Sequence, residues 1–484
     1  MNSTLSPTKK KRLSRVLSFG LLIAGAVFLC TPNFNLFDIL PDAIGYALLL
    51  LAIRNASEVF PHFDTAYKHF YSLFWINLAK IPALFVMLGV TGTDLTERPL
   101  ITVFALSFAV LEWFFAIPAF RALFEGFVYI GEREGVTRAL YAREGKSVDK
   151  LTLLTLIFLI VKGALSFLPE CLYLSTFEHK GSLEPGAINP IVFYPVVAVL
   201  GILISLVVGL VWLFSLVPYF RALKENDGMR ELLLLKERSL KDKLDERSER
   251  RRLRFFFGFL TVGFLLAIDP LIENRDLLPN FLAALAFFLA FSFLGEDRTK
   301  KSGRIISLIY LALSVMENVF SALFFKEFVH TDIAFRDAAL VRYIPVVLSR
   351  LLESGLFFLT VFLILKYLRI FTVRYTGHDL RAADLASGNA LHEELFLRVR
   401  RLGIYSAIYA LLRPVSAVLM AITSRHVITE EEANEFYAEG AIIYSSSFAW
   451  LWILLLVGGI ALAAYAISFF GELKREAGLT KEDE

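Results

Sequence analysis

The sequence is poor in cysteine and in charge. Two cysteines in 484 residues exclude a disulfide-stabilised scaffold. Only 20% of the residues are charged and 56% are hydrophobic, whereas a soluble chain averages ~25% charged and ~45–50% apolar residues. The apolar residues lie in blocks between short charged loops, so a soluble globular enzyme and a disordered protein are excluded as well. The formal net charge of +3 is too small to indicate a nucleic-acid partner.

Signatures of catalysis are also missing. The seven histidines lie in predicted loops or at predicted membrane interfaces, and His392-Glu393 has no second histidine at the spacing of a zinc helix. There is no glycine loop for phosphate and no Gly-x-Ser-x-Gly element. We therefore expect a protein that is not an enzyme and that uses no cofactor or metal.

Long apolar segments are what the sequence does contain. A helix needs about 20 apolar residues to cross ~30 Å of hydrocarbon. The pattern predicts an all-α, polytopic transmembrane bundle whose partner is the lipid bilayer. The twelve predicted segments are 16–31, 38–53, 70–90, 100–120, 151–175, 191–219, 254–270, 278–294, 305–325, 343–368, 402–424 and 441–470.

The basic residues predict the orientation. With a cytoplasmic N-terminus, the loops on that side hold 39 of the 50 lysines and arginines, the opposite loops hold 7, and the segments hold 4. The positive-inside rule then places both termini in the cytoplasm, and we expect a bacterial plasma membrane. The first segment could instead be a signal peptide, but eleven further segments favour an uncleaved helix.

Two pairs of segments are short. Ala43–Ile53 offers eleven apolar residues, or about 16 Å of helix, and Phe281–Leu294 is similar. Segments 1–2 and 7–8 are therefore candidates for hairpins that dip into the membrane from the cytoplasm without crossing it. Such hairpins would leave the orientation of the other segments unchanged.

The chain repeats itself at a slowly rising offset. Asp38-Ile-Leu-Pro-Asp42 recurs as Asp276-Leu-Leu-Pro-Asn280, 238 positions later. This ordered set predicts two six-segment halves related by a pseudo-two-fold axis along the membrane normal. Further matches are Leu111-Glu112 with Leu352-Glu353 (offset 241), Pro169 with Pro414 (245), and Tyr194, Gly209, Phe220, Leu223 and Lys224 with Tyr444, Gly459, Phe470, Leu473 and Lys474 (250).

The predicted domains are the first half (1–223), a charged linker (224–254) and the second half (255–484). The linker holds eleven lysines and arginines among many acids, which predicts a cytoplasmic helix with i,i+4 ion pairs. A solvated linker that anchors the topology is one interpretation, and binding to anionic lipid head groups is the other.

The element Asp38-Ile-Leu-Pro-Asp42-Ala-Ile-Gly45-Tyr46 resembles the D-x-x-P-D-x-x-G-Y motif of small, uncharacterised membrane proteins of Gram-positive bacteria. The resemblance covers about ten residues and implies a bacterial plasma-membrane protein. The second copy departs from the motif, because Asn280 replaces Asp42 and the Gly-Tyr pair is missing. Equal roles for the two copies are therefore not expected.

Seven charged residues lie inside the apolar segments. Each costs ~2.5–3.5 kcal/mol at a helix centre, so seven without partners would cost roughly 17 kcal/mol, more than the ~5–15 kcal/mol stability of a whole protein. They must be paired or hydrated. We expect Lys80 to pair with Glu112, and Arg350 to neutralise Glu353 three residues away. The full set is Lys80, Glu112, Lys162, Glu317, Arg350, Glu353 and Arg413.

These charges give the functional hypothesis. Glu112 and Glu353, at equivalent repeat positions, are the candidate central carboxylates of a substrate site between the halves, with Lys80, Lys162, Glu317 and Arg413 beside them. Asp38 is a further candidate at a hairpin tip. Four cations against three anions slightly favour an anionic cargo. The protein is then a transporter of a small solute or lipid; the alternative is a non-transporting assembly, sensory or subunit protein whose charges are packing bridges.

Overall fold

A computed structural model describes the chain in fourteen stretches. They are residues 16–34, 37–38, 41–91, 98–143, 146–177, 193–268, 271–272, 275–276, 278–294, 298–328, 337–375, 386–423, 449–477 and 479. These residues are almost entirely helical, and their strands form three two-stranded antiparallel hairpins. The chain divides into two compact units, Met1–Asp245 (unit 1) and Glu246–Glu484 (unit 2), which are treated separately below.

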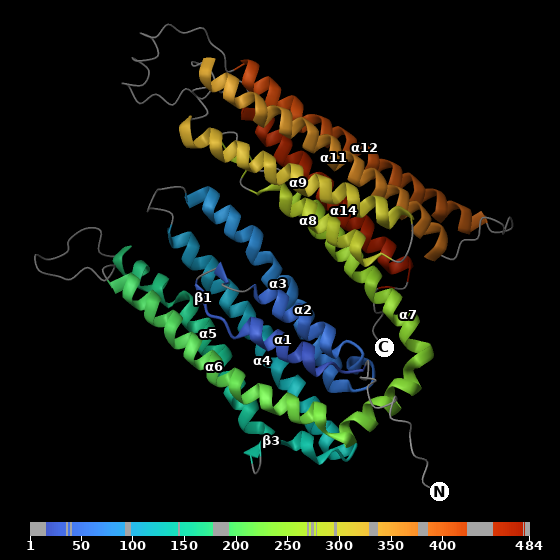
Figure 1. Ribbon diagram of the computed structural model, residues 1–484. Coiled ribbons are helices and arrows are strands. Elements are labelled where there is room, and N and C mark those ends of the chain that lie inside the picture. Colours follow the sequence, from blue (N-terminus) through green and yellow to red (C-terminus); the bar gives the residue numbers. More distant parts are fainter. Residues whose placement is uncertain are drawn as a thin grey trace, which may run out of the picture. The chain divides into compact units, whose positions relative to one another are not determined.

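Unit 1 is a closed bundle of helices. Each helix contacts the next one along the chain, and α6 also contacts α1 (Figure 1). The elements are α1 (Phe19–Leu29), β1 (Asn33–Phe34), β2 (Phe37–Asp38), α2 (Asp42–Ile53), η2 (Ala56–Glu58), α3 (Pro61–Thr91), α4 (Arg98–Arg133), η4 (Thr137–Leu140), β3 (Tyr141–Arg143), β4 (Lys146–Ser147), α5 (Val148–Phe177) and α6 (Tyr194–Glu225).

The described part of unit 2 also consists of helices, with one two-stranded hairpin, β5–β6, between the first two. Helix α7 contains the boundary between the units, and α8, α9, α11, α12 and α14 contact one another in chain order. The elements are α7 (Asp227–Leu266), β5 (Leu271–Ile272), β6 (Arg275–Asp276), α8 (Asn280–Phe293), α9 (Arg298–Glu327), α11 (Asp337–Tyr375), α12 (Ala386–Thr423) and α14 (Ala449–Glu476).

The helices support a multi-pass membrane protein. In the described residues, each of the twelve predicted segments overlaps a helix, and the predicted linker helix overlaps the first part of α7. Among the described residues, six helices are long and apolar enough to cross a membrane: those within α4, α5, α6, α9, α11 and α14. By contrast α1, α2 and α8 have 11, 12 and 14 residues, so they reach only about 16–21 Å.

The short helices α1 and α2 pack closely against each other. A Cβ added to Gly25 would lie 2.9 Å from the carbonyl oxygen of Gly45 and from the side chain of Leu49. Pro41 stands directly before α2, where its missing N–H and fixed φ suit the start of a helix. The two-stranded hairpin β1–β2 joins α1 to the Pro41 turn. The result is a compact helical hairpin that ends inside unit 1.

Contacts of this hairpin recur in unit 2 at constant offsets. Residues of α1, β1 and β2 have their counterparts 238 positions later, and residues of α6 have theirs 250 positions later. The Asn33–Asp38 strand pair matches Leu271–Asp276, the ring contact Phe19–Phe220 matches Phe257–Phe470, and the approach of Gly209 to Cys30 matches that of Gly459 to Ile268.

Candidate polar site in unit 1

The charged residues inside the helices have partners of opposite charge. On α3, Lys80 donates to Glu112 of α4 over 2.6 Å, which confirms the predicted pair. The two side chains are 5% and 12% exposed, so water screens their interaction little. In the described part of both units, each of the seven charges predicted from the sequence contacts an opposite charge. The expectation that these charges must be paired is therefore confirmed.

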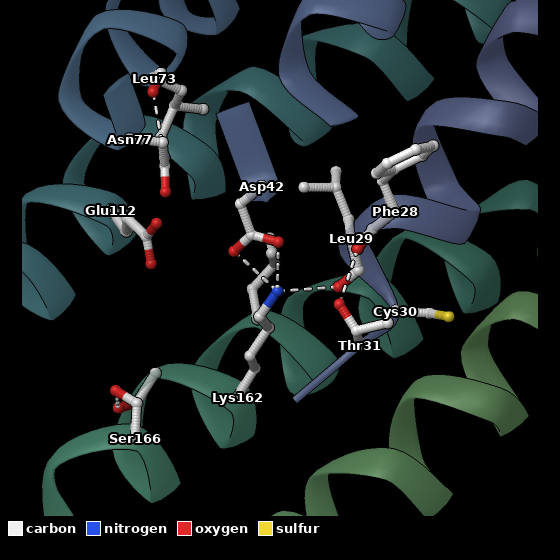
Figure 2. Close-up of polar contacts among 12 residues, drawn as sticks. Phe28, Leu29, Cys30, Thr31, Asp42, Leu73, Asn77, Glu112, Lys162 and Ser166 are labelled. Carbon is white, nitrogen blue, oxygen red and sulfur yellow. Dashed lines mark hydrogen bonds and ion pairs between the residues drawn. The ribbon is translucent and has the colours of Figure 1, made fainter. Parts of the chain in front are cut away.

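The pair of Lys162 with Asp42 was not predicted from the sequence. The Nζ of Lys162, on α5, lies 2.8 Å from both carboxylate oxygens of Asp42 and donates to the carbonyl oxygen of Leu29 over 2.9 Å (Figure 2). Asp42 is the first residue of α2 and Leu29 the last residue of α1. An anion at a helix start and a cation at a helix end both complement the helix dipole. The carboxylate of Asp42 therefore stabilises the start of α2, and the ammonium group of Lys162 stabilises the end of α1.

The Asp42–Lys162 pair borders a small cavity. Asp42, Glu112 and Lys162 supply its charged groups. It offers about 10 Å³ to the centre of a water molecule, roughly the space that one water needs. The rest of the lining is Leu29, Tyr46, Trp113, Ala116, Phe158, Leu159 and Gly163. The cavity is thus a polar spot within an otherwise apolar bundle.

Asn77 adds a further polar group nearby. It is 2% exposed, and its Nδ2 donates to the carbonyl oxygen of Leu73 over 3.0 Å. Its Oδ1 has no hydrogen-bond partner among the described residues, and Figure 2 shows this oxygen pointing towards Glu112. A buried acceptor without a donor costs about 1–3 kcal/mol. A water molecule would supply the missing donor.

The remaining predicted residues gather in unit 2. Arg350 of α11 contacts Glu317 of α9 over 2.8 Å and Asp276 of β6 over 3.3 Å. The other carboxylate, Glu353, is 4.0 Å from Arg413 of α12. Ser314 of α9 donates to Glu353 over 3.0 Å. The two carboxylates on α9 and α11, Glu317 and Glu353, are 0% and 1% exposed.

Two expectations about these charges need correction. With Asp42 and Asp276 included, four cations pair with five carboxylates in the described part of the chain, so these pairs show no surplus of positive charge. In addition, Arg350 was expected to neutralise Glu353, whereas the structure pairs Arg350 with Glu317 and Asp276 and brings Glu353 within 4.0 Å of Arg413. The predicted residue Asp38 pairs through its backbone with Asn33, and its side chain lies outside the described part of the structure.

No cluster of metal-binding side chains is found in the described part of the chain. Among the described residues, three or more histidine, cysteine, aspartate or glutamate side chains nowhere come together in a way that could bind one. Cys30 is a free, buried thiol. Comparisons of the chain with protein-family profiles, curated proteins and solved structures found no match.

Proposed function

We propose that the protein is a transporter in a bacterial plasma membrane, with both termini in the cytoplasm, that moves a small solute or a lipid. The observation that carries the proposal is the water-sized cavity of unit 1. Two helix ends and the charges of Asp42, Glu112 and Lys162 meet there, inside an apolar bundle. In transporters, interrupted helices commonly place their ends at the substrate or ion site.

The contacts that recur at constant offsets support a second part of the proposal. We infer that the two units are copies of one ancestral half, as in many transporters that work by rocking one half against the other. The sequence has no ATP-binding signature, so an ion gradient or a separate ATPase would supply the energy. In this view Glu112 and Glu353 are the central carboxylates of the substrate site.

A ligand screen followed by flux measurements tests the proposal. Purified protein is heated with a panel of amino acids, sugars, nucleosides and organic acids, and solutes that raise Tm are then tested for uptake into proteoliposomes. Movement of a fluorescent phospholipid across the bilayer, detected by dithionite quenching, covers a lipid cargo. We expect Glu112→Gln and Glu353→Gln to lower flux at least tenfold.

The control is Glu125→Gln, on the same helix as Glu112. Glu125 is an exposed residue that pairs with Arg121, so this change should leave flux unaltered. If a solute stabilises both glutamine variants as well as the wild type, the assignment of Glu112 and Glu353 is wrong. If no solute binds and no lipid moves, the transporter proposal fails.

A non-transporting assembly factor, sensor or complex subunit is the second candidate. It is favoured by the close pairing of each carboxylate with a basic side chain of its own unit. On this proposal Glu112→Gln lowers the thermal stability and changes nothing else. The screen distinguishes the two candidates, because only a transporter shows a flux that the variants abolish.

A further inference from the structure

Three oxygen atoms converge at the end of the hairpin of unit 1. They are the carbonyl oxygen of Leu29 and the two carboxylate oxygens of Asp42, and each lies 2.8–2.9 Å from a single point, the Nζ of Lys162. The carbonyl belongs to the negative end of α1. Carbonyl oxygens at interrupted helix ends are the ligands that hold monovalent cations in membrane carriers.

We propose that this hairpin end is a binding site for an ammonium-type monovalent cation, which the chain fills with the ammonium group of its own Lys162. The cation comes from a different element, α5, so it also fixes the hairpin to the rest of the bundle. Lys162 is 6% exposed and Asp42 1% exposed, so neither charge can be solvated by bulk water if the other is removed.

The charged and titratable groups around the site come from every neighbouring element. Asp42 and Tyr46 belong to α2, and Glu112 faces the cavity from α4 while it holds Lys80 of α3. Cys30 follows α1 directly. The positive charges of Lys80 and Lys162 balance the negative charges of Asp42 and Glu112, so loss of the Lys162 charge leaves a net negative site that attracts a cation.

Unit 2 contains a neutral version of the same arrangement. The carbonyl oxygen of Ala267, 238 positions after Leu29, accepts a hydrogen bond from the hydroxyl of Tyr409 over 3.1 Å. The residue 238 positions after Asp42 is Asn280, which is 1% exposed. Thus the ammonium and the carboxylate are both replaced by neutral groups. At this position the cation and the carboxylate are both present in unit 1 and both replaced in unit 2, which is the pattern expected of a cation and its ligand.

The proposal does not depend on transport, so its test uses stability. Lys162→Ala is purified in detergent, and Tm is followed by tryptophan fluorescence at constant ionic strength, with N-methylglucamine chloride replaced stepwise by ammonium, methylammonium, propylammonium or sodium chloride. We expect Lys162→Ala to melt several degrees below the wild type. The small cations should recover part of this loss in a saturable way, whereas the wild type should not respond.

Two controls separate the site from general salt effects. Lys150→Ala removes an exposed lysine of the same helix and should show neither the loss nor the recovery. Lys162→Ala combined with Asp42→Asn removes the carboxylate ligand and should abolish the recovery. The proposal is overturned if small cations fail to stabilise Lys162→Ala, or if they stabilise the double variant or the wild type equally.

A second variant keeps the proposal testable if Lys162→Ala does not fold. Asn280→Asp places a carboxylate at the equivalent hairpin end of unit 2, which has the neutral hydroxyl of Tyr409 in place of an ammonium group. We expect this variant to acquire the dependence of Tm on small cations that the wild type lacks. A Tm that stays independent of these cations would count against a cation site at this position of the hairpin.

Discussion

At the scale of residues, the structure shows how an apolar bundle tolerates charge. Lys80 and Glu112 are both largely buried and lie on neighbouring helices at similar depth, so the pair was predictable from the sequence. The pair of Asp42 and Lys162 was not predictable, because the two residues are 120 positions apart in the sequence. They meet only if the end of the α1–α2 hairpin lies beside the middle of α5.

The buried Lys80–Glu112 pair should be costly to break. Lys80→Met leaves Glu112 without its cation, which typically costs about 3–5 kcal/mol of unfolding free energy. Lys68→Met, on the same helix, removes an exposed ion pair with Asp64 and should change the free energy by less than about 0.5 kcal/mol. Titration with SDS, followed by circular dichroism, measures both values.

The double variant Lys80→Met/Glu112→Leu completes this experiment. Replacing both charges with apolar side chains removes the uncompensated carboxylate, so most of the lost stability should return. If Lys80→Met unfolds as readily as Lys68→Met, the Lys80–Glu112 contact does not hold α3 to α4. A coupling free energy close to zero between Lys80 and Glu112, obtained from the single and double variants, would lead to the same conclusion.

At the scale of elements, the sequence predicted which segments are helical more reliably than where they end. The predicted segment 100–120 lies within α4, which continues to Arg133 even though Pro118 stands inside it. Proline lacks the N–H that would donate to the carbonyl four residues earlier, yet the helix continues through this position. The apolar pattern therefore predicts that a segment is helical but does not predict the residues at which the helix ends.

The crossing of α1 and α2 requires glycine at Gly25. A methyl group there would press on the backbone oxygen of Gly45, which cannot move aside as a side chain can. We expect Gly25→Ala to destabilise the protein by about 1–3 kcal/mol, and Gly25→Val by more. Gly20→Ala is the control, because nothing lies within 4 Å of its added Cβ, and alanine is the better helix former.

Thermal unfolding of the three glycine variants gives the ranking, and hydrogen exchange locates the effect. Faster exchange should be confined to the hairpin, Phe19–Ile53, and to the residues of α6 that pack on it. A Gly25→Ala variant as stable as Gly20→Ala would mean that the two helices do not cross as closely as the structure indicates.

At the scale of the whole molecule, the count of membrane crossings depends on the two hairpins. The sequence alone allowed twelve crossings or fewer, since α1, α2 and α8 are shorter than the ~30 Å of a hydrocarbon layer. The excess of lysine and arginine in the loops on the cytoplasmic side is the same in either case. A hairpin and a pair of crossings both return the chain to the side from which it entered. Charge counting therefore predicts the positions of the termini but leaves the number of crossings undetermined.

Thiol labelling in intact cells determines the number of crossings. In a background without Cys30 and Cys171, a cysteine at Thr31 would face the cell exterior if α1 crossed the membrane, and would be hidden from it if α1 and α2 formed a hairpin that dips in from the cytoplasm. We expect an impermeant maleimide not to label Thr31→Cys from outside. Glu184→Cys, in a predicted outer loop, should react in intact cells, and Ser57→Cys only after lysis. Strong labelling of Thr31→Cys in intact cells would show that the first two helices cross the bilayer despite their short length.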